Sequence, residues 1–132
     1  MKIKHFVYII ARRTESGLVG PVKVGVTRTL GSRLAGIQTG CWDRLEIAYH
    51  FEMVGRDAAY NIERLFHQRL AGNRMQGEWF SVEPIEALEA LCDVVFTFID
   101  AHTPKRDRQV ALIESGAIDN LKIVVDTWGL AS

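Results

Sequence analysis

The chain has 132 residues and no formal net charge, with 48% hydrophobic and 24% charged residues. Such a length and composition are typical of one globular domain, and no run approaches the ~20 apolar residues of a membrane span. Two cysteines are too few for a thiolate zinc site. Arg12 and Arg13 interrupt the apolar start after a few residues, whereas a signal peptide needs a longer apolar region, so we expect a cytoplasmic protein.

The first elements that we expect are the two strands of a β-hairpin. Residues 3–11 are apolar on both alternations from Phe6 onward, which indicates a central strand covered on two faces. Residues 22–27 alternate valines with other residues, and the Gly- and Pro-containing stretch before them predicts a long hairpin loop. Gly25 interrupts the second strand, where glycine often marks a close approach of another group.

A helix and a third strand follow. Thr27 is a candidate N-cap for a helix that runs through about Gln38. Residues 45–54 alternate between apolar and other side chains, which predicts a strand with one buried face and one wet face. Ala48 and His50 fall on the wet face.

Residues 57–72 predict the helix that the rest of the chain is organised around. Asp57 is a plausible N-cap, Gly72 stands where a C′ glycine belongs, and an apolar stripe lies between them. Glu63 and His67 are four residues apart, so both project from one edge of that stripe. They are either part of a site or an ordinary solvated pair.

The last part of the chain predicts a turn, a long helix and a short extension. Residues 72–82 indicate a compact turn or short strand, and Pro84 fits the first turn of an amphipathic helix with an acidic outer face. Residues 109–115 then predict a short helix, and residues 121–128 a strand-like piece.

Together these elements predict an α+β fold, with a small antiparallel sheet of three main strands flanked by helices. We expect residues 1–102 to form this domain. Residues 103–132 would be a C-terminal extension that packs on the domain or on a partner.

The charges are distributed unevenly. Residues 1–40 carry seven basic residues and one acid, whereas the remainder carries nine basic and fifteen acidic residues, so the two parts have charges of +6 and −6. The asymmetry predicts one anion-attracting face, unless the two parts interleave in the fold.

Six short motifs occur in an order that resembles the GIY-YIG endonuclease superfamily, in particular its phage and bacterial branch with a GEWF-like segment. They are VYII at 7–10, KVGVT at 23–27, SRL at 32–34, IQTG at 37–40, IERLFH at 62–67 and GEWFSV at 77–82. The resemblance implies a phage or prophage nuclease that hydrolyses DNA with one Mg²⁺ or Mn²⁺ ion.

The resemblance also implies residue roles. Tyr8 matches the tyrosine of the first triad, Gly25 the glycine of the second, and Arg33 the arginine of the first helix. Glu63 matches the metal-binding carboxylate, and His67 stands where this branch tends to carry a histidine.

A coherent mechanism follows from these roles. Tyr8 would be the general base, with Lys23 on the adjacent strand favouring its phenolate form. Arg33 would clamp the phosphate, and His67 would protonate the leaving group or bind the phosphate. The residues expected to contact substrate are Gly25, Thr27, Arg28, Arg12 and Arg13. Each of the four catalytic candidates also has a purely structural alternative, as a core, surface, ion-pairing or packed residue.

The sequence departs from the family pattern at several points. The first triad lacks its Gly and Ile, Lys23 replaces the second tyrosine, and the hairpin loop is longer than usual. Residues 103–132 are too few for the usual separate DNA-binding domain, so a homodimer or a DNA-binding partner is expected. The rival function is a catalytically weak or inactive module that binds nucleic acid or protein.

Overall fold

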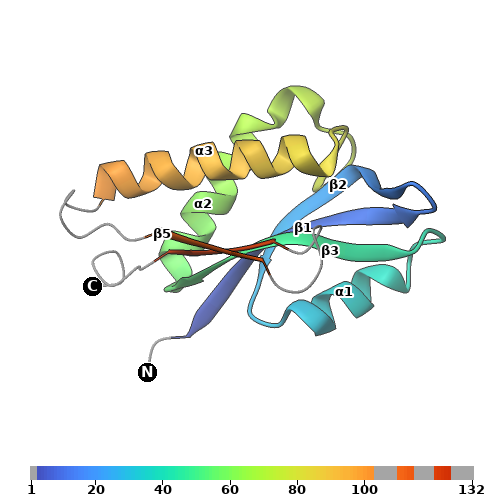
Figure 1. Ribbon diagram of the computed structural model, residues 1–132, viewed down its shortest axis with the longest axis horizontal. Helices are drawn as coiled ribbons and strands as arrows, with labels where there is room; N and C mark the ends of the chain where they lie inside the picture. The colour runs from blue at the N-terminus through green and yellow to red at the C-terminus, as the bar shows by residue number, and fades with distance from the viewer. Residues whose placement is uncertain (1–2, 103–109, 115–120, 126–132) are drawn as a thin grey trace.

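The structure is a computed structural model that describes residues 3–102, 110–114 and 121–125, with side chains over residues 3–98 (Figure 1). Its strands are β1 (Lys4–Thr14), β2 (Gly17–Thr27), β3 (Leu45–Val54), β4 (Trp79–Phe80), β5 (Val110–Glu114) and β6 (Leu121–Val125). Its helices are α1 (Leu30–Gln38), α2 (Arg56–Arg69) and α3 (Pro84–His102), with a short 3₁₀ turn, η1 (Ala71–Asn73). None of the described helices is sufficiently long and apolar to cross a membrane.

The strands form one sheet in the order β4-β2-β1-β3-β6-β5. The first four strands pair antiparallel, whereas β6 runs parallel to β3. The predicted α+β class, an antiparallel sheet flanked by helices, is therefore confirmed. The antiparallel part has four strands instead of three, because Trp79 and Phe80 pair with Lys23 and Val22.

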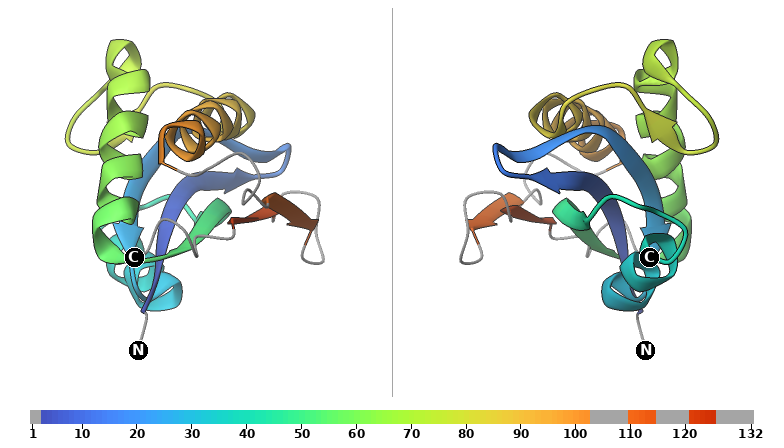
Figure 2. Two further views of the ribbon diagram at one scale, coloured as in Figure 1. Left: turned by 90° about the vertical axis from the view of Figure 1, so that its left-hand side faces the viewer. Right: turned by 90° about the vertical axis from the view of Figure 1, so that its right-hand side faces the viewer.

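Strand β1 is buried on both faces, as its apolar sequence predicts. Val7, Ile9 and Ala11 face a large core shared with α2 and α3. Tyr8 and Ile10 point the other way, into a smaller core covered by α1. Figure 2 shows α3 and α1 on opposite sides of the sheet. Since neighbours along a strand alternate between faces, Tyr8 lies on the α1 side.

The predicted long hairpin loop is wrong. β1 continues to Thr14 and β2 begins at Gly17, so only two residues connect them. Gly17 has a φ of 111°, which few other residues adopt, and the Thr14 hydroxyl donates to its carbonyl oxygen over 2.9 Å. Residues 12–14 of the expected loop instead extend β1, and residues 17–21 extend β2.

The predicted single buried face of β3 is also wrong. The register between β1 and β3 shifts between Ile9 and Ile10. As a result Ile47 packs on the α1 side, whereas Ala48, expected to be wet, is fully buried on the α2 and α3 side. A bulge that inserts one residue reverses the alternation.

The ends of the elements differ from expectation in three places. α1 begins at Leu30 instead of near Thr27, because Thr27 ends β2 and its hydroxyl accepts the Thr29 N–H. α2 begins at Arg56, which places Asp57 in its first turn instead of at the N-cap. It ends at Arg69, so Gly72 lies in η1 and not at the C′ position. The stripe of α2 is buried as predicted.

The C-terminal prediction is half correct. Residues 110–114 are strand β5, not a helix, because they pair antiparallel with β6. Tertiary pairing overrides the weak local helix preference of so short a segment. Residues 121–125 form the expected strand, and the rest of that prediction, residues 126–128, lies outside the described residues.

Candidate active site

The centre of the candidate site is the contact between Tyr8 on β1 and Gly25 on β2. The two residues are direct partners in the antiparallel register. A Cβ atom on Gly25 would lie 2.3 Å from the Tyr8 hydroxyl oxygen and 2.7 Å from its Cζ atom. Only glycine therefore lets the phenol ring lie across β2 with its hydroxyl over the strand.

Replacement of Gly25 by alanine should destabilise the protein and displace the Tyr8 hydroxyl. Overpacking of this kind costs about 1–3 kcal/mol in unfolding free energy. Chemical denaturation measures the change, with Gly36→Ala as the matched control, because a Cβ there meets nothing within 4 Å. That control should gain up to about 1 kcal/mol through helix propensity. Equal stability of Gly25→Ala and wild type would contradict the contact.

Arg33 on α1 covers the Tyr8 hydroxyl. Its Nε atom donates to the phenol oxygen over 3.1 Å. Burial raises the pKa of the Tyr8 phenol above its ordinary value, while the hydrogen bond and charge of Arg33 act in the opposite direction. Tyr8 is only 1% exposed, so its ring and hydroxyl are closed off from solvent.

Two side chains of α2 occupy the outer edge of β2. β4 pairs with β2 only at Val22 and Lys23, so beyond this point no described strand covers that edge. There the Nε2 atom of His67 contacts the Val24 carbonyl oxygen over 3.2 Å. The Glu63 carboxylate accepts the Val26 backbone N–H. Glu63 and His67 therefore flank Gly25 at the open edge.

The environment of Glu63 fits a hydrated divalent cation. Burial raises the pKa of its carboxyl, His67 lowers it and Glu78 raises it further. Within residues 3–98 no group of three or more His, Cys, Asp or Glu side chains could hold a metal. Mg²⁺ keeps several waters and is usually bound by one or two carboxylates together with substrate phosphates. A single half-buried glutamate could thus supply one ligand to a hydrated Mg²⁺ ion.

We expected Lys23 to favour the phenolate form of Tyr8, but its amino group lies against Glu78 and Trp79 instead. Its Nζ atom lies 3.7 Å from Oε2 of Glu78 and 5.5 Å from the centroid of the Trp79 ring. Its side chain is only 15% exposed. The cation that hydrogen-bonds the phenol is Arg33.

Glu78 is the one site residue that sequence reasoning missed. Its carbonyl oxygen accepts the Val24 N–H over 3.1 Å, which holds the GEWF segment against β2. Its carboxylate pairs with Lys23 and adds negative charge near Tyr8, Arg33 and Glu63. The available signal was its place in the GEWF-like motif at residues 77–82.

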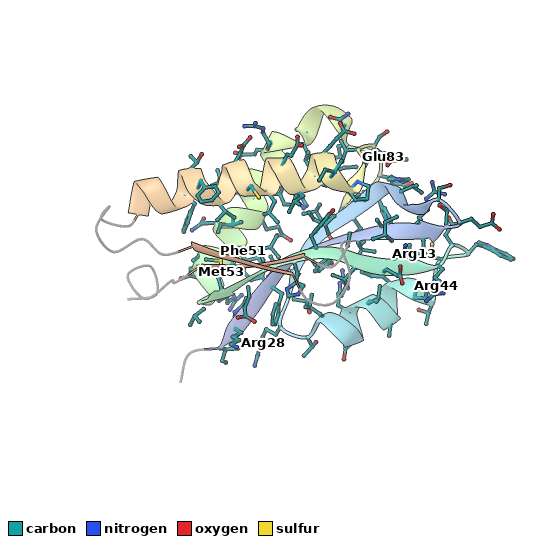
Figure 3. The ribbon with its side chains drawn as sticks, viewed as in Figure 1. Arg13, Arg28, Arg44, Phe51, Met53 and Glu83 are labelled. Atoms are coloured by element: carbon teal, nitrogen blue, oxygen red, sulfur yellow. The ribbon has the colours of Figure 1, made fainter. Side chains whose placement is uncertain are left out.

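The remaining predicted contact residues divide into two groups. Thr27 is the last residue of β2, two residues beyond Gly25, and Arg28 lies between β2 and α1. Arg12 and Arg13 lie at the other end of β1, and Figure 3 shows Arg13 and Arg28 at opposite ends of the sheet. Arg12 binds the Gly20 carbonyl oxygen, and Arg13 pairs with Glu46. The structure does not bring these two arginines to Tyr8.

A small α+β domain with Tyr8 and Arg33 on one face of β2 and Glu63 at the edge of that strand is compatible with a nuclease-like or DNA-binding role. A family model described as the T5orf172 domain matches residues 5–95, and the chain belongs to this family. The domain occurs in phage and bacterial nuclease-like proteins, and no GIY-YIG family model matched. The comparisons with curated proteins and with solved structures found no match.

Proposed function

We propose that the protein is a metal-dependent endonuclease of the GIY-YIG type that hydrolyses phosphodiester bonds in DNA. The observation that carries the proposal is the meeting of Tyr8, Arg33 and Glu63, from three separate elements, around the side-chain-free surface of Gly25. Membership of a family found in nuclease-like proteins supports it.

Each residue has a role that its surroundings allow. Arg33 is an exposed guanidinium that would bind the phosphate as negative charge grows on its oxygens. When it moves to the phosphate, it uncovers Tyr8, which would lose its own proton to solvent and, as the phenolate, take the proton of the attacking water. Glu63 would hold Mg²⁺, which as a Lewis acid supplies positive charge at the scissile phosphate.

His67 and Lys23 are better placed to support the site than to transfer protons. Nε2 of His67 already contacts the Val24 carbonyl oxygen, so His67 holds the β2 edge beside Glu63. Lys23 would add a second cation beside the phosphate, held in place by Glu78.

The activity is tested by incubating the protein with supercoiled plasmid, linear duplex and branched DNA, each with Mg²⁺, with Mn²⁺ and with a chelator. The proposal predicts cleavage of at least one substrate in either metal and none in the chelator. Intact DNA in every metal would contradict it.

A second candidate function is a binding module that keeps the fold without turnover. Two observations favour it: the buried Tyr8 phenol has a raised pKa, and Lys23 occupies the place of the second tyrosine. The two functions share the expectation of DNA binding.

Replacement of Arg33 by alanine separates the two functions. In an enzyme a phosphate clamp acts mainly on the transition state, so Arg33→Ala should lower the cleavage rate about 10²- to 10³-fold. DNA affinity should fall far less. Rates under single turnover and dissociation constants in chelator measure the two effects, with Arg69→Ala, an arginine paired with Asp93 on α3, as the control. Equal losses of rate and affinity would favour the binding module.

A further inference from the structure

Trp42 is an unusual surface residue. It lies in the connection between α1 and β3 and is fully exposed to solvent, unlike the half-buried Trp79. Single exposed apolar residues are common, but a whole exposed indole is not, because tryptophan is usually largely buried. An indole also offers a broad π surface that suits a flat partner.

The exposure of Trp42 is built into the fold. The side chain of Gln38, at the end of α1, fastens the backbone on both sides of it. Its Nε2 atom donates to the Cys41 carbonyl oxygen over 3.4 Å and to the Asp43 carbonyl oxygen over 2.7 Å, and its Oε1 atom accepts the Leu45 N–H over 2.7 Å. The Arg44 carbonyl oxygen also accepts the Arg13 N–H over 2.8 Å. These bonds hold the backbone of the connection on both sides of Trp42, whose indole lies in solvent.

The surface that leads from the candidate site to Trp42 favours an anionic partner. No acidic residue occurs from Ser16 to Trp42, a stretch that carries Lys23, Arg28 and Arg33. Beyond Trp42, Asp43 pairs with Arg12, and Arg44, with a side chain that is 75% exposed, pairs with Glu46. The exposed residues of α1 apart from Arg33 are small, so a sugar-phosphate backbone can approach the helix closely. These residues are Gly31, Ser32, Ala35 and Gly36.

We propose that the outer surface of α1 and the Trp42 turn bind a single-stranded segment of DNA, with Trp42 stacked on an unpaired base. A nucleic-acid strand fits because it combines what the surface offers: phosphates for the cations and flat bases for the indole. A protein partner would need acidic groups along α1 as well as an apolar contact at Trp42. The proposal rests on the proposed function and narrows its substrate to DNA with single-stranded or branched character.

The test is equilibrium binding of a labelled single-stranded oligonucleotide, and of the matching duplex, in chelator. Trp42→Ala should weaken single-strand binding about 5- to 150-fold, the usual loss for one stacked base, and duplex binding clearly less. The slope of log affinity against log salt concentration should be the same for Trp42→Ala as for wild type, because stacking releases no counterion. By contrast, Arg28→Ala should make the slope shallower by about 0.7, the value for one phosphate contact. Trp42→Phe should retain part of the affinity.

The matched control is Tyr60→Ala, which removes another exposed aromatic side chain, on α2. If Trp42→Ala and Tyr60→Ala bind both DNAs as wild type does, the inference is overturned. If Trp42→Ala loses as much affinity for duplex as for single-stranded DNA, the preference for a single strand is overturned. Cleavage assays separate it from the proposed function. Cleavage by wild type with an unaffected Trp42→Ala contradicts the inference alone, whereas Trp42-dependent binding without cleavage supports it and contradicts only the enzyme.

Discussion

Replacement of Glu63 by glutamine should abolish metal-dependent cleavage while the fold survives. The amide keeps an oxygen that can accept the Val26 N–H, but it loses the charge that would hold the metal. A metal's stabilisation of transition-state charge is worth several kcal/mol, and each 1.4 kcal/mol is a factor of ten, so the rate should fall by about 10³-fold or more. DNA cleavage measured against Mg²⁺ concentration checks this.

Glu89→Gln is the control for this substitution. Glu89 is an exposed carboxylate on α3, remote from the β2 edge, and its loss should leave the rate unchanged. Thermal unfolding of both variants shows whether the fold persists. Cleavage by a folded Glu63→Gln variant at the wild-type rate would remove Glu63 from the metal site.

Replacement of Tyr8 by phenylalanine should lower the cleavage rate about 10²- to 10⁴-fold, the usual effect of losing a general base. The ring still fills the core beside α1, and the freed Arg33 side chain can turn to water. The loss of stability should therefore stay near 1 kcal/mol, the net value of one hydrogen bond. Single-turnover rates and chemical denaturation measure the two effects.

Tyr49→Phe provides the comparison, because Tyr49 lies on β3 and packs against the opposite core. It should cleave DNA as the wild type does. If Tyr8→Phe cleaves DNA as fast as wild type, another group must be the general base. The Tyr8 hydroxyl would then serve only to position Arg33.

The sequence predicted the main elements because their patterns are strong. The apolar run of β1 and the stripe of α2 each allow one interpretation. Prediction from the sequence failed where a long-range contact decides which face a strand buries or whether a segment forms a strand. The bulge opposite Ile9 and Ile10 changes the face of β3 without a visible break in the pattern. Residues 110–114 become strand only through their pairing with β6.

In the candidate site, too, local patterns predicted some features, whereas others depend on long-range packing. Spacing placed Glu63 and His67 on one edge of a helix, and family resemblance pointed to Tyr8, Gly25 and Arg33. No local pattern shows that Gly25 is the partner of Tyr8, or that Arg33 rather than a strand lysine reaches the phenol. These contacts depend on the strand register and on where α1 packs.

The role of Glu78 depends on a contact distant in sequence. More than fifty residues separate it from Lys23, its ion-pair partner. The GEWF segment meets β2 only after the sheet has formed, so its carboxylate has no visible partner in the sequence.

The most direct test of the central claim, that the open edge of β2 is a hydrolytic site, is metal add-back on bound DNA. The protein is mixed with branched DNA in chelator, binding is verified, and excess Mg²⁺ is then added while cleavage is followed. The account predicts that wild type begins to cut on addition of the metal, and that Glu63→Gln, bound to the same extent, does not. DNA that stays bound and intact with wild type after addition of Mg²⁺ or Mn²⁺ would contradict it.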